Sequence, residues 1–304
     1  MDFNDVLGHQ KPLEIINAYI ESSNFSGAYI FSGAEGIGKK MIAKIIAQKL
    51  NSSEQNIEHP DIHLIEKGDS LIKIEDIREI QRQANFRPYQ GKMNIFIIDN
   101  AHKLNPDSAN SLLKILEEPP KDALIILITH KPQNIIKTVL SRCKTIKFTP
   151  LVRSNLEDIL IKNFLLDRAS AHFLSYYTEG RIGLALKLKD TALLREKNKI
   201  FDSFLLAAKP LDHNIMSQSK EQLYVFLNIL VSWFRDIYLL KVGLDAKEII
   251  HLDRQDDLVK EAARFSFKQL NDIMSTISES LLYLEKNINN KLLLHNLGAQ
   301  LWKA

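Results

Sequence analysis

"GAEGIGKK", residues 33–40, is the stretch that determines the fold class of this chain. It follows the short apolar run "AYIFS" and precedes the amphipathic run "MIAKIIAQKL", so a strand leads into a glycine loop that opens a helix. Gly33, Gly38 and Lys39 satisfy the phosphate-loop pattern G-x-x-x-x-G-K-[ST], whose backbone N–H groups bind phosphates. Lys40 stands at the last position, where a Ser or Thr hydroxyl would ligate the Mg²⁺ of a nucleotide. The stretch therefore predicts a P-loop fold with an altered metal site.

The buried run "NIFIID", residues 94–99, predicts the second half of such a site. Its last residue, Asp99, is placed to hold the metal through water. The next residue in hydrolytic P-loop proteins is commonly Glu, which activates the attacking water. Asn100 can orient a water but cannot take its proton at neutral pH. Lys40 and Asn100 together predict that hydrolysis has been lost; the alternative is an autonomous ATPase that tolerates an unusual loop.

Strand-like runs alternate with amphipathic helices through the first 150 residues. The runs at 28–32, 94–99, 123–129 and 144–148 have strand length and mostly β-branched or apolar residues. Three helical stripes lie between them, with apolar residues three or four positions apart: Ile42, Ile45, Ile46 and Leu50; Ile74, Ile77, Ile80 and Ala84; Ala109, Leu112, Leu113 and Leu116. Asn105 and Pro106 are typical of the start of the third helix. The alternation predicts an α/β core, a parallel sheet with helices on both faces.

Proline and glycine placement predicts a different architecture for the rest of the chain. All nine prolines lie at or before Pro210, and only two of the eleven glycines lie beyond Gly183. Such a stretch, rich in Leu, Ile, Lys and Glu, is typical of a helical bundle. We therefore predict three domains: the P-loop core at 1–149, a small helical lid at 150–190 and an all-α collar at 191–304 that drives assembly.

Composition excludes several kinds of site. Cys143 is the only cysteine, so neither a disulfide nor a cysteine-built zinc site forms within the chain, and we expect a buried, inert thiol. His59 and His63 have metal-like spacing, but Pro60 argues against a helix and no third ligand is evident, so we predict a structural or surface role and no metal. The first residues lack the features of a signal peptide and no long apolar run predicts a membrane span, so we expect a cytoplasmic protein.

Two longer motifs, "NSLLKILEEPP" (residues 110–120) and "LSRCKTIKF" (residues 140–148), resemble those of clamp-loader AAA+ subunits. This family includes the bacterial γ/τ and δ′ subunits of DNA polymerase III and the subunits of replication factor C. The runs "HPDIHLIE", "FRPYQGKMNIFIIDNAHKLN" and "NINNKLLLHNL" extend the resemblance over almost the whole chain. Within the family, Lys40 and Asn100 resemble the δ′ type of subunit, which does not itself hydrolyse ATP.

The resemblance implies roles for individual residues. Arg142 matches the arginine of the S-R-C motif, which reaches the γ-phosphate of ATP on a neighbouring subunit as an arginine finger in trans. The alternative is an arginine that only forms a salt bridge at the sheet edge. Thr129 resembles the first sensor, and Gly183 stands where active subunits carry the arginine of the second sensor. The degenerate nucleotide site implied in this way comprises Gly33, Gly36, Gly38, Lys39, Lys40, Asp99, Asn100 and Thr129.

The resemblance also implies partners and cofactors. The expected partners are the γ/τ ATPase subunits, the δ subunit, the sliding clamp and primer–template DNA, all in a hetero-oligomer that is accessory to a DNA-directed DNA polymerase, a nucleotidyltransferase. ATP is expected on the neighbouring subunits, with nucleotide binding by this chain in doubt. Family members often carry a four-cysteine zinc module, but the corresponding "NSSEQNIE" (residues 51–58) has no cysteine, which implies no zinc.

Overall fold

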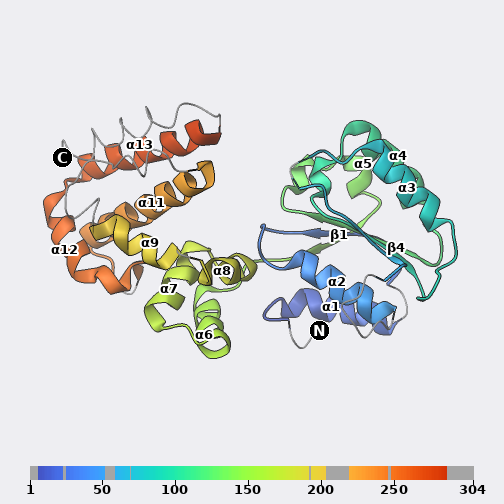
Figure 1. Ribbon diagram of the computed structural model, residues 1–304, viewed down its shortest axis with the longest axis horizontal. Helices are drawn as coiled ribbons and strands as arrows, with labels where there is room; N and C mark the ends of the chain where they lie inside the picture. Colours follow the sequence, from blue (N-terminus) through green and yellow to red (C-terminus); the bar gives the residue numbers. More distant parts are fainter. Residues whose placement is uncertain are drawn as a thin grey trace. The chain divides into compact units, whose positions relative to one another are not determined.

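The computed structural model describes residues 6–22, 25–51, 59–68, 70–191, 193–202, 219–245 and 248–285. The chain divides into two compact units (Figure 1). Unit 1 consists of Met1–Val152 with Glu179–Leu184, and unit 2 consists of Arg153–Thr178 with Ala185–Ala304. The predicted lid at 150–190 is thus shared between the two units, and the division into three domains stays a prediction.

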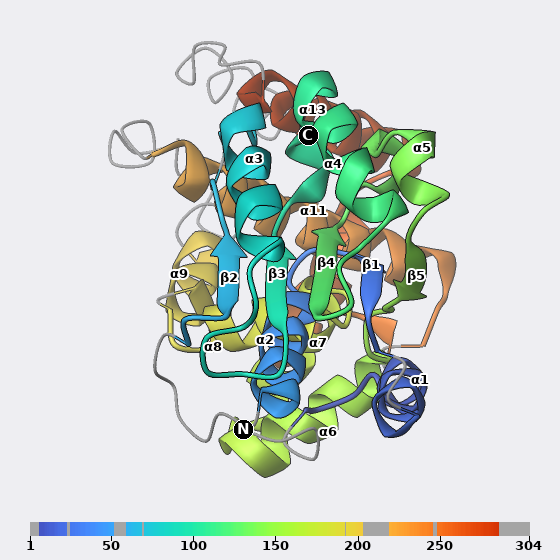
Figure 2. The same ribbon diagram turned by 90° about the vertical axis from the view of Figure 1, so that its right-hand side faces the viewer.

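Unit 1 is built on a five-stranded parallel sheet with the order β2-β3-β4-β1-β5 (Figure 2). The strands are β1 (Gly27–Ser32), β2 (Ile62–Ile65), β3 (Asn94–Ile98), β4 (Ala123–Thr129) and β5 (Lys144–Lys147). Every residue of β3 and β4 is buried, because helices cover both faces of the sheet centre. The predicted parallel sheet is confirmed. The edge strand β2 escaped prediction because it is short and its residues are only partly buried.

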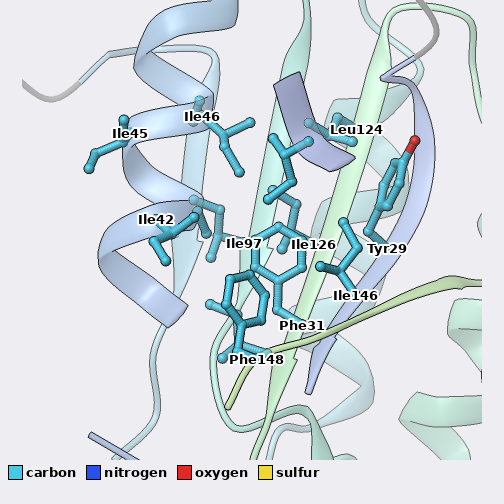
Figure 3. Packing of buried hydrophobic residues seen from close by; sticks show 14 of the residues in the cluster. Tyr29, Phe31, Ile42, Ile45, Ile46, Ile97, Leu124, Ile126, Ile146 and Phe148 are labelled. Carbon is cyan, nitrogen blue, oxygen red and sulfur yellow. The ribbon is translucent and has the colours of Figure 1, made fainter. Parts of the chain in front are cut away.

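Helices cover both faces of this sheet, as predicted. On one face, α1 (Gln10–Glu21) and α2 (Lys39–Leu50) pack against Tyr29, Phe31 and Ile126 (Figure 3). The other face carries α3 (Ile74–Ala84), α4 (Pro106–Glu117) and the short α5 (Lys137–Leu140), packed against residues such as Ile30 and Ile125. Alternate residues of β1 therefore enter opposite cores, as the period of two requires. The short 3₁₀ turns η2 (Ala101–Lys103) and η3 (Pro132–Asn134) follow β3 and β4.

The start of α4 follows the sequence prediction. The Asn105 side chain accepts a hydrogen bond from the Ser108 N–H at 2.8 Å, and Pro106 is the first helical residue. This arrangement satisfies one of the backbone donors that a helix start leaves without an intrahelical acceptor.

A buried aspartate holds the turn that leads from α3 into β3. Asp61, with 3% of its surface exposed, accepts hydrogen bonds from the backbone N–H groups of Tyr89, Gln90 and Gly91 at 2.7, 2.8 and 2.6 Å. Burial opposes its charge, but these three donors outweigh burial and lower the pKa of Asp61. The aspartate of the "HPD" run is therefore an anchor for a turn about 30 residues further along the chain.

Unit 2 is helical throughout its described residues. Its helices are α6 (Arg153–Phe164), α7 (Arg168–Tyr177), most of α8 (Ile182–Lys189), α9 (Leu193–Ile200), α11 (Lys220–Val242), α12 (Gln255–Arg264) and α13 (Phe267–Glu285), with the 3₁₀ turn η6 (Leu252–Arg254). The run "NINNKLLLHNL" (residues 287–297), which extends the family resemblance, lies outside the described residues, which end at 285.

The long helix α11 is the centre of unit 2. Its segment Gln222–Val242 is long and apolar enough to cross a membrane by length and composition, contrary to our reading of the sequence, and 56% of its most apolar stretch is buried inside the fold. The buried side chains include Leu227, Leu230, Trp233 and Phe234. Burial of this kind is typical of the core helix of a globular unit.

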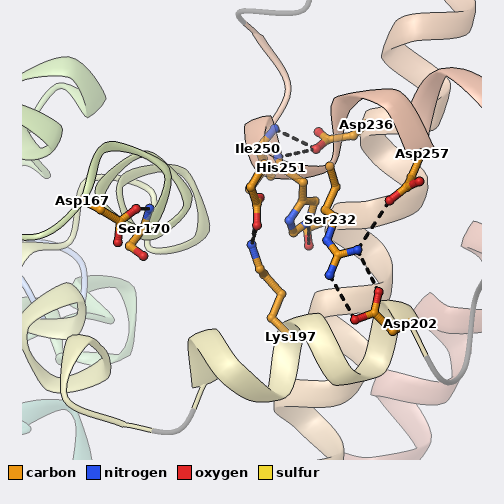
Figure 4. A network of polar contacts seen from close by, with 11 residues as sticks. Asp167, Ser170, Lys197, Asp202, Ser232, Asp236, Ile250, His251 and Asp257 are labelled. Carbon is orange, nitrogen blue, oxygen red and sulfur yellow. Dashed lines mark hydrogen bonds and ion pairs between the residues drawn. The ribbon is translucent and has the colours of Figure 1, made fainter.

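A buried polar network joins α11 to the segment that follows it (Figure 4). Asp236, which has no exposed surface, accepts hydrogen bonds from the backbone N–H groups of Ile250 and His251 at 2.7 and 2.9 Å. His251 is equally buried, and its Nε2 lies 2.9 Å from the Ser232 hydroxyl. The α11 side chains therefore fix the backbone at 250–251.

Two further helices reach the same segment. In α7, the His172 ring donates from Nε2 to the carbonyl of Ile249 at 2.9 Å. The Lys197 side chain of α9, only 4% exposed, pairs with Asp253 at 2.9 Å. Helix α7 belongs to the predicted lid, and α9 and α11 belong to the predicted collar. Because all three helices contact residues 249–253, these contacts join lid and collar residues into one compact unit.

We expect Asp236→Asn to change how stability depends on pH. Burial raises the pKa of Asp236 from 3.8 to about 6, against the opposing effect of the two backbone donors and Arg235. Folding therefore favours the protonated carboxyl, a contribution that is complete below pH 3.8 and disappears as the pH rises through 6. The stability of the wild type relative to Asp236→Asn should increase by on the order of 3 kcal/mol between pH 7 and pH 4.

Urea denaturation of both proteins across this pH range measures the difference. Burial lowers the pKa of His251 and makes both proteins less stable in acid, so only the difference between them is diagnostic. The exposed Asp256→Asn is the matched control. A difference between wild type and Asp236→Asn that does not vary with pH would contradict the expectation.

Candidate functional site: a self-occupied phosphate loop

The glycine loop lies between β1 and α2, at the carboxyl edge of the parallel sheet. Gly33, Gly36 and Gly38 have φ values of +149°, +75° and +102°, which L-residues rarely adopt. A Cβ on Gly33 would also lie 2.2 Å from the carbonyl oxygen of Phe148. The N–H of Gly33 donates to the carbonyl of Thr129, at the end of β4. The sequence context inferred for a phosphate loop, strand then loop then helix, is present.

Lys39 is turned onto its own loop. Its Nζ donates to the carbonyl oxygens of Gly33 and Ala34 at 2.6 and 2.5 Å, and only 6% of the residue is exposed. Burial lowers the pKa of Lys39 to about 8, with partial compensation from Asp99 and Glu35. The ammonium that would meet the phosphates of a nucleotide is satisfied by the loop itself.

Lys40 stands between two carboxylates. Its Nζ lies 2.6 Å from Glu66 Oε1 and 3.3 Å from Asp99 Oδ2. Burial opposes the charge of Lys40, but the hydrogen bond to Glu66 and the charge of Asp99 outweigh burial and raise its pKa. In P-loop proteins, Mg²⁺ lies between the hydroxyl at this loop position and the aspartate of the neighbouring strand. In this chain a cationic ammonium, in place of a hydroxyl, faces that aspartate.

Glu66 was not identified from the sequence. It follows β2, and the run "IHLIE" carries the signal of an acid at the end of an apolar stretch, the same signal that identified Asp99. Because β2 pairs in parallel with β3, the two acids come to the same edge of the sheet. Lys40 is the residue whose long side chain reaches both.

Asn100 and Thr129 lie beside this site. Asn100 adopts the left-handed conformation (φ 54°, ψ 44°), which asparagine tolerates better than most residues, and its N–H donates to Asp99 Oδ1 at 3.0 Å. Thr129 is buried, with its hydroxyl 3.3 Å from His102 Nδ1 and accepting the Lys131 N–H at 3.0 Å. The loop, the end of β3 and the end of β4 thus come together as the motifs predict.

The loop is also covered from outside. The N–H of Leu184, near the start of α8, donates to the carbonyl of Gly36 at 3.0 Å. A Cβ on Gly183 would lie 2.8 Å from that same carbonyl oxygen. At Gly183, which the resemblance assigns to the second-sensor position, the backbone therefore packs directly on the loop and leaves no space for a side chain. The Lys40 ammonium beside two carboxylates does not fit a magnesium ion at the same place, because the two cations would repel each other.

Arg142 lies apart from the loop, beyond the end of α5. Its Nε and Nη2 lie 2.9 and 2.6 Å from Glu117 Oε1, and its Nη1 donates to the carbonyl of Thr138 at 2.9 Å. One third of the side chain is exposed. Within the described part of the chain, no contact joins Arg142 to the loop residues, so the two candidate sites are separate.

The other candidate residues have structural surroundings. His63 stacks on Phe96 with ring centres 4.9 Å apart, and His59 Nδ1 accepts the N–H of Asp61. Cys143 is only partly buried, where a buried thiol was expected, and burial raises its pKa to about 12, which favours the protonated thiol. Among the described residues, no group of three His, Cys, Asp or Glu side chains is arranged to hold a metal ion.

The fold and the loop define this chain as an AAA+-like P-loop protein with a helical C-terminal region. Two family models match it: "DNA polymerase III, delta subunit" over residues 8–152 and "DNA polymerase III, delta subunit, C terminal" over residues 196–301. The chain belongs to the clamp-loader subunits of bacterial DNA polymerase III and is related to the δ′, γ and τ subunits.

Individual relatives differ in how much of them the chain covers. The DNA polymerase III subunit δ′ of Bacillus subtilis is 27% identical over 94% of this chain and 93% of its own length. The τ subunit of Escherichia coli is 32% identical over 63% of this chain, which spans only 33% of the length of τ. A crystal structure of a γ subunit-related protein of DNA polymerase III from Thermotoga maritima matches 96% of this chain and 99% of that one, with a TM-score of 0.56 at 20% identity, which supports the fold.

Proposed function

We propose that this chain is a δ′-type clamp-loader subunit that does not hydrolyse ATP and supplies Arg142 to ATP bound by a neighbouring subunit. The observation that carries the first part is the position of Lys40 between Asp99 and Glu66. An ammonium in the place of Mg²⁺ pairs with both carboxylates. No unpaired carboxylate of this pair then remains beside the loop to bind the Mg²⁺ that accompanies a nucleotide. Coverage of the loop by Gly183 and Leu184 supports the same inference.

The second part rests on the exposed position of Arg142. A guanidinium bridges phosphate oxygens through parallel N–H donors, and one third of this side chain faces solvent, outside the chain's own loop site. A phosphate that it serves therefore belongs to another subunit. The proposed partners are the γ/τ subunits, the δ subunit, the sliding clamp and primer–template DNA, in a cytoplasmic hetero-oligomer accessory to a DNA-directed DNA polymerase.

We expect the isolated chain to release no phosphate from ATP above the background of its Lys39→Ala variant. The loop lacks a metal-ligating hydroxyl at Lys40, and Asn100 cannot act as a base. Steady-state phosphate release with Mg²⁺ and ATP at pH 7 measures this directly. Activity of the wild type clearly above that of Lys39→Ala would favour the alternative, an autonomous ATPase with an unusual loop.

A further inference from the structure

The contacts of Arg142 come from two elements that are both anchored in the core of unit 1. Glu117 is the last residue of α4, directly after the buried Leu116, and Arg142 follows α5, whose Val139 is fully buried. Leu116 and Val139 belong to the same apolar cluster. The backbone positions of Glu117 and Arg142 are therefore fixed by packing, and the two side chains meet above that cluster.

The contacts leave part of the guanidinium available. Arginine has five N–H donors: one on Nε and two on each terminal nitrogen. Nε donates a hydrogen bond to Glu117 and Nη1 donates one to the Thr138 carbonyl, whereas Nη2 lies 2.6 Å from Glu117 Oε1 as an ion pair. At least one N–H donor on each terminal nitrogen is left by these hydrogen bonds, and such donors can bind phosphate oxygens. Glu117 and Thr138 therefore hold the guanidinium while donors on both terminal nitrogens remain for a phosphate.

Stability alone does not account for this arrangement. Half of the Glu117 side chain is exposed, and exposed ion pairs contribute little to folding because water screens them and ordering two long side chains costs entropy. Ordering of the Arg142 side chain does favour catalysis, because a group that is already positioned does not lose rotamer freedom when the reaction occurs. A group held in one orientation by two contacts is a pre-organised electrostatic element.

We propose that Glu117 is a positioning residue for Arg142, fixing the orientation of the guanidinium for phosphate on a neighbouring subunit. This inference rests on the proposed function. It gives the carboxylate that ends the "NSLLKILE" helix a role in catalysis at a site that Glu117 itself does not touch. The opposite role, a carboxylate that sequesters Arg142, predicts an effect of opposite sign and is separated by the test.

The test compares Glu117→Ala, Glu117→Gln, Arg142→Ala and the double variant Glu117→Ala/Arg142→Ala in the reconstituted clamp loader. Glu117→Ala should lower the kcat of the DNA- and clamp-stimulated ATPase at the served site by roughly tenfold, with the KM for ATP within about twofold, because the arginine is misoriented but still present. Glu117→Gln keeps an acceptor oxygen and should recover most of the rate. The double variant should be no slower than Arg142→Ala alone, since Glu117 acts only through Arg142.

Glu118→Ala, which removes the neighbouring exposed carboxylate, is the matched control and should behave as wild type. A kcat for Glu117→Ala equal to or above that of the wild type, while Arg142→Ala is defective, overturns the positioning role and leaves the proposed function intact. A double variant much slower than Arg142→Ala also overturns it. If Arg142→Ala itself is fully active, the proposed function fails first, and the two failures are thereby distinguished.

Discussion

Arg142→Ala should leave folding and assembly intact but depress the DNA- and clamp-stimulated ATPase of the reconstituted clamp loader, together with clamp loading. Loss of an arginine finger typically costs about 10³ to 10⁵ in turnover at the site it serves. Arg142 serves only one subunit interface. The decrease in the ATPase rate of the whole complex should therefore be smaller than the decrease at that single site. Folding should be unaffected because Arg142 is partly exposed and its pair with Glu117 is a surface pair.

Arg142→Lys should fail as well, because an ammonium keeps the charge but lacks the planar fork. Single-turnover ATP hydrolysis and clamp-loading rates measure both variants, with size-exclusion chromatography to confirm that the complex has formed. Arg153→Ala, which removes another exposed arginine, is a suitable control. Wild-type rates in both Arg142 variants would make this residue an ordinary salt-bridge partner of Glu117 and refute the arginine-finger proposal.

Asp61→Ala should destabilise unit 1 by about 3 kcal/mol, because three backbone N–H groups lose a charged acceptor at once. Tyr89 donates to one carboxylate oxygen, and Gln90 and Gly91 donate to the other. Asp61→Asn keeps one acceptor oxygen and places an NH₂ group at the other, so its loss of stability should be intermediate.

Hydrogen exchange provides a local measurement for the same variants. The amides of residues 89–91 should lose protection in Asp61→Ala before the rest of unit 1 does, and urea denaturation gives the global cost. The exposed Asp122→Ala should stay within about 0.5 kcal/mol of the wild type. Unchanged exchange at 89–91 would show that the turn holds its shape without Asp61.

Much of the α/β core could be predicted from local patterns. The buried strands at 94–99 and 123–129 are continuous apolar runs, and the helix stripes repeat every three or four residues, so each element is visible within a short window. Asn105 and Pro106 marked the start of α4 because capping involves residues three positions apart. The loop glycines were equally readable, since their need for positive φ is a local property.

The candidate site was predicted in its residues but not in its contacts. Asp99 was recognised because it matches the acid that ATP hydrolysis requires near the metal. Lys40 and Asn100 were recognised because they replace the hydroxyl and the glutamate that hydrolysis requires at their positions. Their arrangement depends on Glu66, which is 26 residues from Lys40 and follows a strand too short and too exposed to be recognised. Likewise, a role for Arg142 was proposed from its motif, whereas its pairing with Glu117 across 25 residues could not be read from the sequence.

The sequence by itself determined the parallel P-loop core, the altered phosphate loop and the family to which the chain belongs, because all of these reside in short runs of residues. The tertiary structure was needed to see that Lys40 lies between Glu66 and Asp99, that Gly183 and Leu184 pack on the loop, and that helices of the predicted lid and collar share one unit. The physical reason is the same in each case. Such contacts join residues far apart in the chain, and their energies depend on where packing of the core brings the backbone, which no local pattern of residues encodes.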